Sequence, residues 1–175
     1  MASVSERVPA PDGLALVEAL VNTLDIEAGA DDLDTADGRA RLGLTQDEVP
    51  GARELRESLR AALLAHAGHP PHREVTPLGE LLSGAPLLVA VDARDGSASL
   101  APADGGPLLS RVAAAVAQSL VAGTWTRLKA CEAETCHWAY YDRSPAGRGR
   151  WCSMAVCGAR AKMRSYRARQ AGEAS

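Results

Sequence analysis

Apolar side chains recur at the spacing of an α-helix in three long stretches of the chain. Residues 12–27 carry Leu or Val at positions 14, 17, 20, 21 and 24, with Asp12 as the expected N-cap. Residues 47–66 and 107–129 carry similar stripes, and a short helix is expected from Thr76 and Pro77 onward. Residues 29–38, between the first two helices, are acidic and predict a loop. The pattern therefore predicts a mostly helical chain.

One stretch has the pattern of a β-hairpin instead. An apolar run at 87–91 is followed by the turn sequence Arg94-Asp95-Gly96 and by a second short run at 97–100. The predicted fold class is α+β and mostly helical, with a helical N-terminal domain that contains one β-hairpin. Residues 1–11 predict a flexible arm without the apolar stretch of a signal peptide. No apolar run approaches the ~20 residues of a membrane span, so we expect a cytoplasmic protein without a membrane partner.

The four cysteines of the chain form two pairs with the same spacing. Cys131-x4-Cys136 and Cys152-x4-Cys157 are separated by 15 residues. Four thiolates are the ligand set of a structural zinc ion in tetrahedral coordination. Two disulfides are the alternative in an oxidising compartment, whereas paired cysteines in a reducing cytosol indicate a metal site. We predict one structural Zn²⁺, with His137 as a fifth candidate ligand that four thiolates make unnecessary.

Charge and aromatic residues divide the chain near residue 125. Residues 1–125 hold 9 Lys and Arg against 18 Asp and Glu, and residues 126–175 hold 10 against 4. These balances, −9 and +6, indicate two units with different partners. All three Trp and all three Tyr lie between residues 125 and 166. A small C-terminal module that depends on metal and large rings is therefore expected, joined without a flexible linker by the helix over 107–129.

The order of elements in this module resembles a treble-clef finger. A first cysteine knuckle is followed by a strand with Trp138 and Tyr140 on one face, then by a loop, then by a helix that the second cysteine pair opens. Ser153 is a candidate cap for that helix. A stripe of small or apolar residues at 154, 157, 161, 165 and 168 is expected to face the metal and the hairpin.

The same segment is basic, with no acidic residue between Arg143 and Gln170. A solvated face is one interpretation, but uncompensated positive charge favours a phosphate-bearing partner. The candidate nucleic-acid-binding residues are Arg143, Arg148, Arg150, Arg160, Lys162, Arg164, Arg167 and Arg169. Trp138, Tyr140 and Tyr141 are candidates for stacking on bases, with packing around the metal as the alternative.

Residues 127–170 resemble a CGNR zinc finger. The resemblance rests on Cys136-x-Trp138, Asp142-Arg143-Ser144, Trp151-Cys152-Ser153-Met154 and Cys157-Gly158-Ala159-Arg160. The stretch Val21-Asn22-Thr23-Leu24-Asp25 resembles the ABATE domain that precedes this finger. The resemblance implies a sensor or interaction domain over 12–126, a finger over 127–170 and a tail over 171–175. It also implies a bacterial, in particular actinobacterial, stress-related transcription regulator. Ala159 stands where the finger has its signature Asn.

The N-terminal domain carries no enzyme motif, and we expect no catalytic activity. Asn22, Thr23 and Asp25 are candidates for lining a ligand pocket, with helix termination as the alternative. Three histidines, at 66, 69 and 72, are compatible with a metal site or with a polar surface loop. A small-molecule or protein effector and a homodimer are the partners expected for this domain.

Three functions compete on this sequence. The first is a DNA-binding transcription regulator whose basic helix contacts DNA. The alternative is a zinc-stabilised adaptor that binds an acidic protein without touching DNA. RNA binding or a small enzymatic role is the third.

Overall fold

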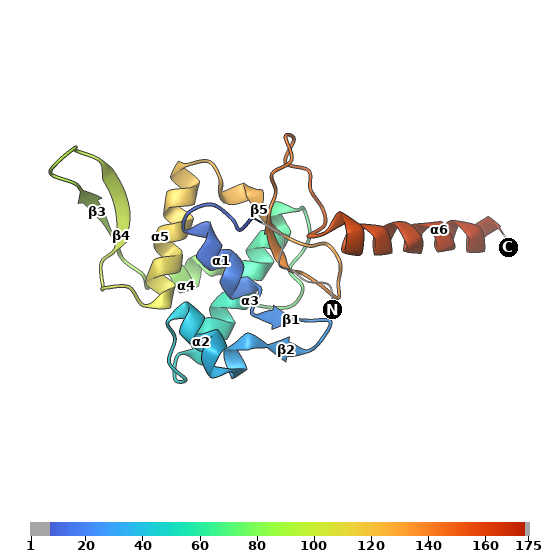
Figure 1. The fold of residues 1–175 in the computed structure, drawn as a ribbon, viewed down its shortest axis with the longest axis horizontal. Helices are drawn as coiled ribbons and strands as arrows, with labels where there is room; N and C mark the ends of the chain where they lie inside the picture. Colours follow the sequence, from blue (N-terminus) through green and yellow to red (C-terminus); the bar gives the residue numbers. More distant parts are fainter. Residues whose placement is uncertain (1–7, 174–175) are drawn as a thin grey trace.

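The computed structural model describes residues 8–173, which form a body of packed helices from which a hairpin and a helix project (Figure 1). Three helices build the body: α1 (Leu14–Val21), α3 (Val49–His66) and α5 (Leu108–Val121). Their stripes meet in one core, in which Val17, Leu59 and Val112 have no exposed area. The mostly helical α+β class is confirmed. Within the described part, no helix combines the length and the apolar character needed to cross a bilayer.

The acidic segment after α1 is more structured than its sequence predicts. Its elements in chain order are β1 (Leu24–Asp25), β2 (Ala30–Asp31), the 3-10 turn η1 (Asp32–Asp34) and α2 (Ala36–Leu42). The two strands pair antiparallel, and the Thr35 side chain accepts a hydrogen bond from the Gly38 N–H and caps α2. The predictions for this segment are therefore wrong in part: the first helix ends at Val21 and does not reach residue 27, and residues 29–38 form mostly regular elements where a loop was expected. The N-cap of α1 is Gly13, and Asp12 precedes it with φ of 48°.

The predicted hairpin is confirmed. Strand β3 (Leu87–Val91) pairs antiparallel with β4 (Ala98–Pro102), and Gly96 adopts a left-handed φ of 73° in the turn. The short helix α4 (Leu78–Leu82) precedes the hairpin, with Pro77 at its N-cap. The hairpin extends from α5 at one end of the molecule (Figure 1).

The prediction of one helix over residues 107–129 is correct only for its first part. α5 ends at Val121, and Gly123 turns the chain with a left-handed φ of 67°. The chain continues with the 3-10 turn η2 (Trp125–Arg127) and strand β5 (Leu128–Ala130), which pairs antiparallel with β6 (Ala139–Tyr141).

Strands β5 and β6 belong to the body. β5 lies against α3, and Leu128 and Ala130 have no exposed area, while Ala139 is 3% exposed within the main core. The packing therefore shows no separation at the boundary expected near residues 125–130. The strand also starts later than its alternation predicts, since His137 has a left-handed φ of 48° and Trp138 precedes β6.

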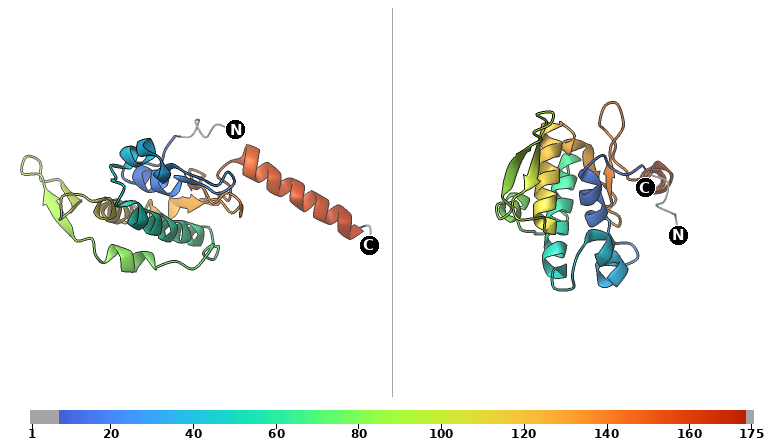
Figure 2. Two further views of the ribbon diagram at one scale, coloured as in Figure 1. Left: turned by 90° about the horizontal axis from the view of Figure 1, so that it is seen from below. Right: turned by 60° about the vertical axis from the view of Figure 1, so that its left-hand side comes forward.

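The C-terminal helix projects from the body at the end opposite to the hairpin (Figures 1 and 2). A short π-helical segment, η3 (Met154–Gly158), leads into α6 (Ala159–Glu173). Along residues 159–171 every residue is exposed except Ala161, which is half-buried. The prediction that the stripe faces the metal and the hairpin is therefore wrong for most of its members: Cys157 is buried, but Met154 is 74% exposed, and Ser165 and Ala168 are exposed as well. Residues 171–173 continue the helix, and the rest of the predicted tail lies outside the described residues.

Residues 1–7 of the predicted flexible arm lie outside the described residues. The arm's last residues pack on the body instead. Ala10 is 4% exposed, and its N–H donates to the Glu18 carboxylate at 2.6 Å. The Arg143 guanidinium donates to the carbonyls of Val8 and Pro9. These bonds join the start of the described chain to the loop that follows β6.

Candidate metal centre and basic surface

The four cysteine sulfur atoms converge at one point. All four Sγ atoms lie within 4.8 Å of one another, with 3.5 Å between Cys136 and Cys152 and 3.7 Å between Cys152 and Cys157. Tetrahedral zinc with Zn–S bonds of ~2.3 Å places its ligand sulfurs about 3.8 Å apart. The donor set and its spacing therefore fit one zinc ion. Among the described residues, these cysteines form the one group of metal-ligating side chains close enough to hold an ion.

Two different structures position the two cysteine pairs. Cys131 directly follows β5, and its N–H donates to the Trp138 carbonyl at 2.9 Å, so the body fixes the first knuckle. The Cys136 N–H donates to the Ala133 carbonyl and closes that knuckle. The second pair spans the start of η3, where the Ser153 hydroxyl accepts from the Val156 N–H as predicted. The metal therefore joins the end of a core strand to the beginning of the projecting helix.

The electrostatics of the four thiols favour a bound cation. Hydrogen bonds from Cys136 and Cys152 lower the pKa of the Cys131 thiol. Hydrogen bonding to Cys131 raises the pKa of Cys136 and of Cys152, and burial raises that of Cys157. For three of the four thiols the surroundings therefore disfavour the thiolate form. A divalent cation supplies the charge that four thiolates need.

The loop after β6 depends on Asp142, which is 4% exposed. Its carboxylate accepts from Lys129 Nζ at 3.0 Å, from the Ser144 N–H at 3.0 Å and from the Gly149 N–H at 2.7 Å. Burial raises the pKa of Asp142, but the hydrogen bonds from Ser144 and Lys129 outweigh this effect. The pKa is therefore well below its usual range, and the carboxylate stays ionised. A Cβ on Gly149 would lie 2.9 Å from this carboxylate, so the loop requires glycine there. The sequence Asp142-Arg143-Ser144 contributed to the family resemblance, but it did not predict that Asp142 holds the loop together through these hydrogen bonds.

The residues expected to line a ligand pocket are engaged in the fold instead. The Asn22 side chain donates to the Ala139 carbonyl at 3.0 Å and accepts from the Ala139 N–H at 2.7 Å. The Thr23 hydroxyl donates to the Leu20 carbonyl, and Asp25 accepts from the Ala28 N–H. None of the three lines the two best-defined cavities of the described chain. We therefore correct the pocket interpretation: Asn22 fastens α1 to β6.

The three histidines likewise join the body to the cysteine segment. His66 Nδ1 lies 2.7 Å from the Leu128 carbonyl, His69 Nε2 lies 3.0 Å from the Glu132 carboxylate, and the ring of His72 lies 5.8 Å from that of His137. Burial lowers the pKa of His66, which favours its neutral form. His69 and His72 lie in the loop that follows α3, as the surface-loop interpretation expects, whereas His66 is the last residue of α3.

A buried ionic cluster on α3 was not expected from the sequence. Arg60 has no exposed area, donates from Nη2 to the Val21 carbonyl at 2.9 Å and has Nε 3.3 Å from Glu57. Glu57 also lies 2.8 Å from Arg56 and 2.9 Å from His72. Burial raises the pKa of Glu57, but contacts with His72, Arg60 and Arg56 outweigh it and leave the pKa at about 2. The cluster explains three charged residues in the apolar stripe of α3.

Three of the eight candidate nucleic-acid contacts are engaged within the chain. Arg150 pairs with Glu132 at 2.7 Å, and Arg160 pairs with Glu27 at 2.8 Å. Arg143 binds the carbonyls of the N-terminal segment and lies over the Tyr141 ring at 5.0 Å. The positive charge of the segment is therefore compensated in part, because acidic residues from other parts of the chain pair with two of its arginines.

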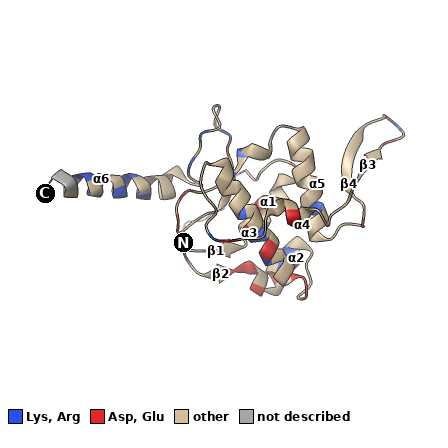
Figure 3. Ribbon diagram, turned by 180° about the vertical axis from the view of Figure 1, so that it is seen from behind, with Lys and Arg blue, Asp and Glu red and all other residues tan. Residues whose placement is uncertain are grey.

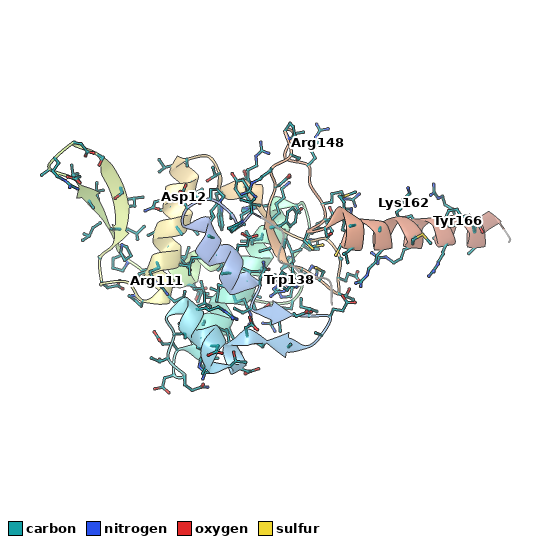
Figure 4. All side chains as sticks on the ribbon, viewed as in Figure 1. Asp12, Arg111, Trp138, Arg148, Lys162 and Tyr166 are labelled. Carbon is teal, nitrogen blue, oxygen red and sulfur yellow. The ribbon has the colours of Figure 1, made fainter. Side chains whose placement is uncertain are left out.

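The other five basic side chains are exposed and carry no ion pair with a described residue. They are Arg148, Lys162, Arg164, Arg167 and Arg169. Arg148 lies on the projecting loop, and Lys162 and Tyr166 extend into solvent from α6 (Figure 4). Figure 3 shows basic positions along α6 and acidic positions gathered around β2 and α2. The structure therefore separates the two charges in space.

The aromatic residues are mostly packing groups. Tyr140 is 5% exposed and donates its hydroxyl to the Gly149 carbonyl at 2.7 Å, so it is withdrawn from stacking on a base. Trp151 packs against the cysteine cluster, with the Arg150 guanidinium 5.2 Å from its ring. Tyr141 and Trp138 are half-buried. Ala159, at the signature Asn position, is exposed and is the first residue of α6.

Comparison with known proteins agrees with this site. Residues 127–170 match the family model of the CGNR zinc finger. No curated protein matches the chain. The match begins one residue before β5 and ends within α6, and it contains all four converging cysteines. These cysteines form the site of one structural zinc ion.

Proposed function

Because residues 127–170 are a CGNR zinc finger, we propose that this chain is a non-enzymatic DNA-binding protein in which α6 contacts the duplex. The observation that carries the proposal is the exposure of α6. The helix stands clear of the body, and four of its five basic residues have no acidic partner among the described residues: Lys162, Arg164, Arg167 and Arg169.

The sequence of α6 contributes little to the stability of the helix. It buries no apolar face, and Arg160, Arg164 and Arg167 follow one another at spacings of four and three residues, where like charges repel. The segment η3, which leads into α6, is held in place by the buried Cys157 and by the Ser153 cap. Phosphates would relieve the repulsion along the rest of the helix. The structure thus favours an anionic partner over a solvated face.

The dimensions of α6 suit a duplex. A helix of 15 residues is ~22 Å long, and the major groove of B-DNA admits one helix. Arginine predominates on it, and the guanidinium group bonds phosphate or guanine in a bidentate manner. Arg148 on the neighbouring loop supplies a fifth exposed basic group. In this arrangement the finger positions the helix, and the arginines make the contacts.

The wider role follows from the same proposal. We assign the chain to transcription regulation in the cytoplasm, in response to a stress signal. The N-terminal helices are the ABATE-like part, which receives a small-molecule or protein effector. The contact of Asn22 with β6 supports this assignment, because it gives the motif Val21-Asn22-Thr23-Leu24-Asp25 a direct connection to the finger.

The test is a salt titration of DNA binding by the full, zinc-loaded chain, followed by fluorescence anisotropy of a labelled duplex. Five phosphate contacts predict a slope of about −4.5 in log K against log salt. Arg164→Ala and Arg167→Ala should each make the slope shallower by about 1. Arg94→Ala removes an exposed positive charge from the distant hairpin and should leave the slope unchanged. Absent or salt-independent binding would refute the proposal.

A second candidate is an adaptor that binds an acidic protein instead of DNA. The pairing of Arg160 with Glu27 favours it, because α6 already accepts a carboxylate within this chain. Tagged protein recovered from nuclease-treated extract separates the two functions. A protein partner that remains after nuclease treatment, and is lost with Arg164→Ala, supports the adaptor.

A further inference from the structure

The β3–β4 hairpin has one covered edge and one uncovered edge. The outer edge of β4 faces α5, where the Gln118 side chain donates to the Leu100 carbonyl at 2.7 Å. The outer edge of β3 has no strand beside it among the described residues. Because the hairpin extends from the end of the molecule, this edge is accessible to another chain (Figure 1).

The register shows which backbone groups lie on that edge. The Asp92 N–H donates to the Ser97 carbonyl, and the Ala103 N–H donates to the Pro86 carbonyl, so the even-numbered residues of β3 bond to β4. The N–H and C=O groups of Leu87, Val89 and Val91 therefore point outward. Three donors and three acceptors form an unpaired row.

The edge also lacks the features that protect edge strands. Residues 87–91 contain no charge, no proline and no bulge. The side chains are as open as the backbone: Leu88 is 57% exposed, Val89 is 70% and Val91 is 63%. An apolar, unprotected edge of this kind is a template for strand addition.

We propose that two copies of this chain associate by antiparallel pairing of β3 with β3. A two-fold axis at Val89 places Val89 beside the partner's Val89 and Leu87 beside the partner's Val91. In this register all six outward groups of each copy are bonded, because every outward residue meets an outward residue. The two hairpins become one four-stranded sheet, and the interface is isologous.

A second copy suits this edge because the strand is complementary to itself. The nearest charged residue, Asp92, lies opposite the partner's Pro86, so no like charges face each other. A shift of the register by two residues would leave outward groups unpaired at both ends of the sheet. The pairing uses the end of the molecule opposite to α6, so it does not depend on the proposed DNA contact.

The test combines sedimentation equilibrium with amide exchange on the full, zinc-loaded chain. The native chain should dimerise with rising concentration. Val89→Lys should raise the dimer dissociation constant tenfold or more, because it sets two charges side by side at the axis. Ser99→Lys is the matched control, since it adds the same charge to an exposed position of β4, and it should leave the dimer intact.

Amide exchange identifies the mode of association independently of any variant. The amides of Leu88 and Ala90 should be protected at every concentration, because they bond to β4. The amides of Leu87, Val89 and Val91 should become protected only where the dimer forms. A chain that stays monomeric up to ~1 mM would overturn the inference. A dimer in which these three amides still exchange as in the monomer would overturn it too, as would pairing of this edge only with a foreign strand.

Discussion

Removal of zinc should release α6 and leave the body folded, although β5 and β6 lie inside the zinc-finger segment. Leu128, Ala130 and Ala139 are buried in the main core, and Asn22 bonds both backbone groups of Ala139. These contacts need no metal. The second cysteine pair and α6, in contrast, are joined to the body through the cysteine cluster and through the ion pairs of Arg150 with Glu132 and of Arg160 with Glu27.

The size of the effect follows from the helix lengths. α6 supplies 15 of the 67 described residues that lie in α-helices, so chelation should reduce the helical signal in far-UV circular dichroism by about a fifth. An unsupported helix of that length is marginal in water, which is why its signal should be lost. The thermal transition of the remaining helices should persist.

Amide exchange with and without chelator provides the decisive measurement. Protection should fall over residues 150–173 and in the knuckle between Cys131 and Cys136, and it should remain in β5 and β6. Addition of zinc should restore it. Loss of protection at Leu128–Ala130, or loss of the body's thermal transition, would refute the reasoning, because the finger would then be a unit that only metal folds.

Three further predictions test the packing and the charges. Leu128→Ala should lower the free energy of unfolding of the whole body by about 2–5 kcal/mol in urea titrations, whereas Leu120→Ala, at a 59% exposed position, should change it by less than about 0.5 kcal/mol. Glu57 has a pKa of about 2 in the folded chain and an ordinary, higher pKa when unfolded. Its carboxylate therefore stabilises the fold above pH ~4.5, and this contribution is lost as pH falls toward 2. Glu57→Gln should remove that acid sensitivity and cost about 3–5 kcal/mol at pH 7, because it leaves a buried guanidinium without its counter-charge. Glu27→Gln frees the arginine at the start of α6 and should tighten DNA binding roughly two- to fivefold at low salt, measured by the same anisotropy assay.

The metal site was predictable because its information is local in the sequence. Two pairs with equal x4 spacing, a cap at Ser153 and a basic segment identify ligands and helix without knowledge of the rest of the fold. The hairpin was predictable for the same reason, since Asp95-Gly96 defines its turn. The Thr35 cap of α2 was also a local signal, but the acidic residues around it favoured a loop.

The errors occurred where distant residues decide the structure. Strands of three residues, such as β5, leave no periodicity, so the helical pattern of α5 was extended through Gly123. The partners of Arg150 and Arg160 lie 18 and 133 residues away, and no spacing rule connects them. The polar residues at the end of α1 suggested a pocket because the strand that Asn22 binds begins 117 residues later.

The separation of charge depends on the zinc joint. Residues 1–125 carry a balance of −9 and residues 126–175 a balance of +6, so a freely jointed α6 would be drawn onto the acidic region around β2 and α2. The cysteine cluster fixes the first turn of the helix, and only Arg160 reaches an acid of that region, at Glu27. The other four basic residues of α6 form no ion pair with a described acid of that region. If α6 binds a duplex as proposed, the projection of the helix lets the anionic partner approach it at the end of the molecule, away from the acidic region around β2 and α2.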